Sequence, residues 1–116
     1  MRMQISTAVA ALAVVGTFLG ACSEPTPAQE REMQEIAWNR VGQDAIRAKL
    51  RDPESAEFSE VRFSEKGGTK VTCGFVNSRN GFGGMGGPQR FVAAGDVLSF
   101  LEEEVQDFDE VWNRYC

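Results

Sequence analysis

The sequence has no histidine, and its three cysteines are too far apart to form a CxxC motif. Without imidazole the chain cannot build a Ser-His-Asp triad, a Cys-His dyad or an HExxH zinc site. Basic residues are also scarce, with 12 Lys and Arg against 17 Asp and Glu and a net charge of -5. An acidic chain is a poor match for nucleic acid or for polybasic binding to a membrane surface. The 116 residues are enough for one domain.

The chain has one long apolar run, and it lies at the N-terminus. It covers residues 5–18 and follows Arg2. A bilayer span needs about 20 residues, so a run of about 14 is short for one. Its length and position are typical of the hydrophobic region of a secretory signal peptide, here residues 1–21. A buried N-terminal helix is the alternative, but the run has no polar face.

The run ends in Leu19-Gly20-Ala21-Cys22. This segment resembles a bacterial lipobox, which implies cleavage before Cys22 and modification of Cys22 with diacylglycerol and an acyl chain such as palmitate. Two or three acyl chains anchor a protein stably, whereas one does so only marginally. The alternative is an ordinary signal peptide with a chance cysteine, but cleavage after Ala21 would need a small residue in place of Leu19.

The lipobox resemblance implies a lipoprotein of the cell envelope that faces the periplasm, with the membrane as its first partner. Ser23 follows the cysteine, where Asp commonly retains Gram-negative lipoproteins at the inner membrane, so we expect the outer membrane. Residues 22–29 are polar and contain two prolines, which predicts a tether. Residues 30–116 are then a single domain.

Two cysteines remain once Cys22 is assigned to the lipid. In an exported chain, an even pair is by default a disulfide, so we expect Cys73 to pair with Cys116. A redox-active or metal-binding pair is the alternative, but the sequence supplies neither CxxC spacing nor a further soft ligand.

Hydrophobic periodicity predicts an α+β domain. Spacings of three and four residues predict helices over Glu30–Arg51 and Glu103–Tyr115. Alternation and turn residues predict four antiparallel strands: Glu57–Ser64, Thr69–Asn77, Arg90–Ala94 and Val97–Leu101. We expect both helices on one face of this small sheet, with one disulfide.

The first predicted helix carries an apolar stripe. Its members follow helical spacing and are Trp38, Val41, Gly42, Ala45 and Ile46. We predict that the stripe belongs to the core. A ligand platform around Trp38 is the alternative.

A glycine-rich segment between the second and third strands is the candidate binding loop. Its residues are Asn77, Arg79, Asn80, Phe82, Gly83, Gly84 and Met85. In one interpretation Phe82 and Met85 are exposed contacts, or the amides form an anion-binding nest beside Arg79 and Arg90. In the other, the segment is a wide connection with Phe82 folded onto the core. It is neither a Walker motif nor a dinucleotide fingerprint, so no cofactor is expected.

Two further segments resemble a family of small bacterial proteins of uncharacterised function. Residues 50–58 are similar to the pattern L-K-D-P-x-S-A-x-F, and residues 73–84 to C-G-x-V-N-x-x-N-x-[FY]-G-G. Residues 90–92 and 112–116 match the ends of those proteins. The resemblance implies no activity, but it supports the pairing of Cys73 with Cys116.

Three kinds of function stay open at this stage. The first is a non-catalytic module that binds an envelope protein or cell-wall partner through the loop; exposure of both Phe82 and Met85 would favour it. The second is an envelope hydrolase with paired carboxylates; two acids facing each other in a cleft would favour it. Its candidate acids are Asp52, Glu54, Asp96 and Asp109. The third is a purely structural role. Glu102–Glu104 are interpreted as a solvated helix start.

Overall fold

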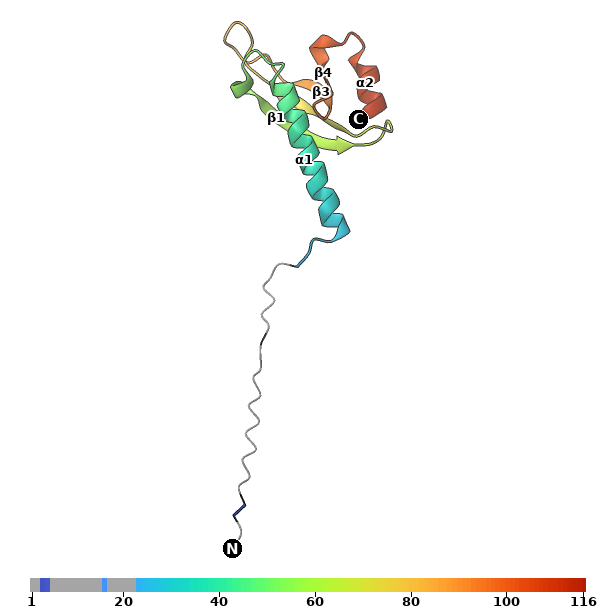
Figure 1. Ribbon diagram of the computed structural model, residues 1–116. Helices are drawn as coiled ribbons and strands as arrows, with labels where there is room; N and C mark the ends of the chain where they lie inside the picture. Colours follow the sequence, from blue (N-terminus) through green and yellow to red (C-terminus); the bar gives the residue numbers. More distant parts are fainter. Residues whose placement is uncertain (1–2, 5–15, 17–22) are drawn as a thin grey trace.

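A computed structural model describes Met3, Gln4, Gly16 and residues 23–116 (Figure 1). The predicted signal peptide and the lipidation site Cys22 lie outside the described residues, apart from those three positions. The domain holds two α-helices and four strands, with short 3-10 turns at Pro53–Ser55 and Glu102–Glu104: α1 (Pro27–Arg47), β1 (Glu57–Ser64), β2 (Val71–Asn77), β3 (Gln89–Ala94), β4 (Leu98–Leu101) and α2 (Phe108–Tyr115).

Helix α1 begins three residues before its predicted start. Thr26 and Gln29 form a reciprocal capping box, and Pro27 occupies the first turn. These features fix the helix start at Pro27, so the polar segment before the domain is shorter than predicted. The helix ends at Arg47 rather than Arg51.

The four strands form an antiparallel meander in the order β1-β2-β3-β4. The observed strands agree with the predicted ones to within two residues at every end. β1 is an edge strand, and a β-bulge interrupts its pairing between Ser59 and Arg62. Glu60 lies in this bulge with a positive φ of 50°. A bulge of this kind, flanked by charged residues, is typical of edge strands that avoid further pairing.

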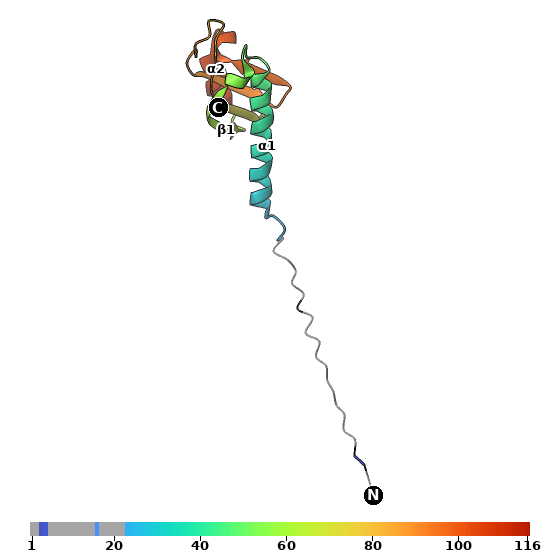
Figure 2. The same cartoon turned by 90° about the vertical axis from the view of Figure 1, so that its left-hand side faces the viewer.

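The two helices lie on opposite faces of the sheet, so the prediction that both pack on one face is wrong. Thr72 of β2 faces α1, where its hydroxyl hydrogen-bonds Asn39. Cys73, the next residue, faces α2 and packs with Phe108. Neighbouring side chains of a strand point to opposite faces, and Figure 2 shows α1 and the C-terminal end on opposite sides of the molecule. Residues Val71–Gly74 are therefore all buried.

Helix α2 is much shorter than the predicted Glu103–Tyr115 helix. Glu102–Glu104 form a separate 3-10 turn, and α2 begins at Phe108. The carboxylates of Glu102 and Glu104 bind Arg90 and Lys49, which come from other parts of the chain. These tertiary contacts favour a turn at a place where helical periodicity alone predicts continuation.

The predicted disulfide between Cys73 and Cys116 is confirmed. It joins the middle of β2 to the residue that follows α2. Arg62 and Ser64 of β1 add hydrogen bonds to the carbonyl oxygens of Cys116 and Tyr115 at 2.8 and 2.6 Å. The C-terminus is therefore fixed to the sheet by one covalent and two polar contacts.

Candidate functional site

The glycine-rich loop between β2 and β3 is a defined structure. The amides of Phe82 and Gly84 donate to the side-chain oxygen of Asn80 at 2.9 and 3.3 Å, and the amide of Gly87 donates to that of Asn77 at 3.0 Å. Arg79 and Met85 form an isolated antiparallel bridge. The two asparagines that the sequence singled out therefore hold the loop in shape.

Phe82 is at the tip of this loop and is 99% exposed, so the interpretation that it folds onto the core is wrong. Met85 is 43% exposed. Gly83 and Gly87 have φ of 84° and 89°, a conformation that side-chain-bearing residues rarely adopt. The backbone thus turns sharply around Phe82 and holds its ring in solvent.

The loop does not form the anion-binding nest that was considered as an alternative. Its amides donate to oxygens of the loop itself, as above, and to the Ser55 hydroxyl, which accepts from the Arg79 amide at 2.8 Å. The Arg79 guanidinium lies 3.7 Å from Asp52. Arg90 bonds to Glu102 and Asp109 at 2.8 and 2.6 Å. Both expected anion partners are thus engaged with carboxylates.

The four acids named for a hydrolase do not face one another across a cleft. Asp52 faces Arg79 and Asp109 faces Arg90, while Glu54 and Asp96 are exposed. Hydrogen bonds from the Arg90 side chain and backbone lower the pKa of Glu102. The same pairing raises the pKa of Arg90. A general acid needs a raised carboxyl pKa, so the Glu102–Arg90 pair fits a structural contact.

The loop lies at the end of the domain that is farthest from the start of α1. Beyond the C-terminal end of that helix, Arg51 packs so closely on Gly81 that a Cβ there would lie 2.6 Å from the guanidinium. A helix of 21 residues spans roughly 31 Å at the standard rise per residue. Figures 1 and 2 both show the loop remote from the first turn of α1. Phe82 is therefore held well away from Pro27, where α1 begins.

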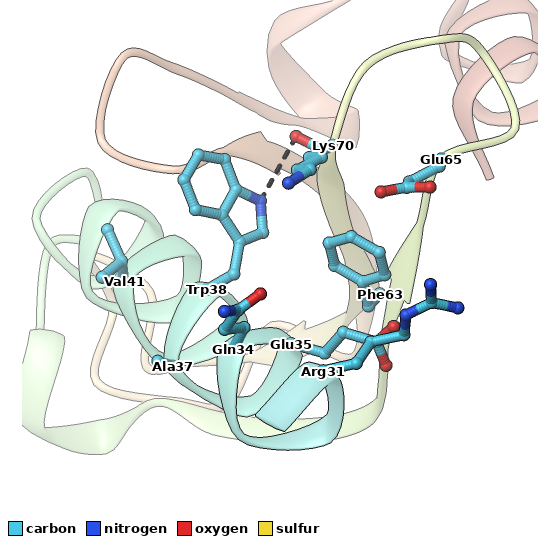
Figure 3. A pocket seen from close by; sticks show the side chains of 9 residues that line it. All are labelled: Arg31, Gln34, Glu35, Ala37, Trp38, Val41, Phe63, Glu65 and Lys70. Carbon is cyan, nitrogen blue, oxygen red and sulfur yellow. Dashed lines mark hydrogen bonds between the residues drawn. The ribbon is translucent and has the colours of Figure 1, made fainter. Parts of the chain in front are cut away.

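A hollow lies between the first half of α1 and the β1–β2 turn, at the position where the sequence offered a platform around Trp38 as the alternative to a core stripe. It has a volume of about 640 Å³, and Trp38 and Phe63 line it (Figure 3). The Trp38 indole nitrogen donates to the carbonyl of Lys70 at 3.2 Å. Of the predicted core stripe, only Gly42 and Ile46 are buried, while Val41 is 41% exposed. Trp38 is half-buried, because its ring packs against Gly95 in the β3–β4 turn while it also lines the hollow.

Across the part of the chain that the structure describes, no helix combines the length and apolar content needed to cross a bilayer. Over the same residues, no three acidic or cysteine side chains gather as a metal site would require. No family model, curated protein or solved structure matches this chain. Functional interpretation therefore depends on the geometry described above.

Proposed function

We propose that this protein is a non-catalytic lipoprotein of the bacterial envelope, anchored through Cys22, that binds an envelope partner through Phe82. One observation carries the proposal. A phenyl ring is 99% exposed at the tip of a loop whose backbone is hydrogen-bonded to its own asparagines. An aromatic ring in this position contributes no buried area to the folded domain, whereas it can contribute buried area to a complex.

Aromatic residues are common among the side chains that dominate binding energy, because they bury a large area at a small cost in conformational entropy. Binding by a rigid loop also avoids the cost of ordering a flexible one. The loop lies at the end of the domain remote from the start of α1, so the ring stays available to a partner when the segment before α1 is held at the lipid. The chemistry expected of the partner is an apolar pocket.

Anchoring is tested by replacing Cys22 with serine. We expect Cys22→Ser to move the protein from the membrane fraction to the soluble fraction, because acyl chains supply the membrane affinity. Mass spectrometry of the natural protein should show a lipid-modified N-terminal cysteine. Ser23→Ala is the matched control and should stay membrane-bound. A Cys22→Ser protein that remained in the membrane fraction would contradict the anchor.

Loop binding is tested by chemical crosslinking in intact envelopes followed by pulldown. We expect Phe82→Ser to lose the specific crosslinked species, because the ring that fills the partner's pocket is gone. Val97→Ser is the matched control, since Val97 is also a strongly exposed apolar residue, at 79%, but lies in the β3–β4 turn. An unchanged set of crosslinks in Phe82→Ser would refute the proposal.

A further inference from the structure

The face of the sheet that carries α2 has a small apolar socket. Its lining residues are Thr69, Val71, Val92, Ala94, Leu98, Phe100, Val111 and Tyr115, and its volume is about 140 Å³. Leu98 and Phe100 remain 56% and 37% exposed beside it. The socket exists because α2 has only eight residues and leaves this part of the face uncovered.

The size of the socket matches one aromatic ring. An apolar protein cavity of about 150 Å³ is large enough to hold benzene. Phe82 supplies a phenyl group of that size, fully exposed, on the same chain. The molecule therefore displays both an exposed phenyl ring, here called the knob, and a socket large enough to receive it.

Phe82 cannot enter the socket of its own chain. The loop follows Asn77 at one end of β2, whereas the socket includes Val71 at the other end of that strand. Six residue-to-residue steps along the strand separate these ends by roughly 20 Å. A contact between knob and socket must therefore join two molecules.

We infer that the partner of the loop is a second copy of this chain, whose socket receives Phe82. The inference rests on the proposed function, since it names the partner of the same loop. The contact joins two different surfaces, so each dimer keeps one free knob and one free socket. Such heterologous contacts extend into rows unless the rotation closes a ring.

The test places a photoreactive phenylalanine analogue at position 82 of the full-length protein and irradiates intact envelopes. We expect a ladder of dimers and larger species of this chain, with crosslinks that map to Leu98, Phe100 or Val111. Crosslinking only to a different protein would overturn self-association and leave the proposed loop function intact. Absence of any crosslinked product would overturn both.

Substitutions in the purified lipoprotein, solubilised in detergent, give a second measurement. Phe82→Ser and Leu98→Ser should each weaken self-association about tenfold, because each removes one side of the same apolar contact. Val97→Ser is the control, as Val97 is adjacent to Leu98 and exposed but does not line the socket. Equal effects of Leu98→Ser and Val97→Ser, or a monomer at all concentrations, would overturn the inference.

Discussion

The two faces of the sheet are covered in different ways. On one face, α1 has 21 residues and contacts all four strands. Its cluster is apolar and fully buried: Ile46, Val76, Phe91, Ala93 and Leu101. Gly42 lets the helix approach closely, since a Cβ there would lie 2.9 Å from the Thr72 hydroxyl oxygen. This face is held by packing.

On the other face, the eight residues of α2 bury less. The disulfide between Cys73 and Cys116 holds one end of this helix. Arg90 holds the other, since it lies over the rings of Phe108 and Trp112 at 5.2 and 5.5 Å while it pairs with Glu102. A short helix thus depends on covalent and ionic contacts, and the surface that it leaves open is where the socket forms.

The largest expected effect comes from breaking the disulfide. The bridge links residues separated by 43 positions, and the chain-entropy model gives about 4 kcal/mol for a loop of that size. We expect reduction to lower the free energy of unfolding by up to about 4 kcal/mol. Hydrogen exchange should show α2 losing protection first, with the α1 face retained. Equal loss of exchange protection on both faces would contradict the conclusion that α1 is held by packing and α2 by the disulfide and Arg90.

A smaller effect is expected from Gly42→Ala. The new methyl group would meet Thr72 and Ala93 at 2.9 to 3.3 Å, so α1 would have to shift from the sheet. Overpacking of this kind costs about 1–3 kcal/mol, which should exceed the gain of up to about 1 kcal/mol in helix propensity. Urea unfolding would measure the difference. Gly84→Ala has open space around it and is the control; a stabilised Gly42→Ala protein would show that this face is loosely packed.

The smallest effect is expected from Glu102→Gln. Arg90 lowers the pKa of Glu102 in the folded protein, so the contribution of this carboxylate is present above its unfolded pKa of about 4.3 and is lost as pH falls through the lower folded value. Because the Glu102 side chain is 38% exposed, the loss at pH 7 should be about 0.5 kcal/mol. The free energies of unfolding of the natural protein and the Glu102→Gln variant, measured from pH 7 to pH 2, should become equal in acid. A difference that did not change with pH would exclude the ion pair as its cause.

The sequence predicted the strands best and the helices less well. Strand ends follow from alternation and from turn residues such as Gly67 and Gly95, which are local signals. Helix α2 was predicted too long because Val105 fits the helical spacing, while the competing contacts of Glu102 and Glu104 come from distant residues. In the loop, composition identified the candidate residues but not whether Phe82 faced the core or solvent.

Local chemistry in the sequence determined the α+β class, the four strands and the two cysteines available to pair, because periodicity and cysteine number do not depend on distant contacts. Only the tertiary structure decided which face each helix covers, that Trp38 lines a hollow, that Phe82 is exposed and that a socket lies open beside α2. Those properties depend on helix length relative to the sheet and on contacts between residues far apart in the chain, which no local pattern records.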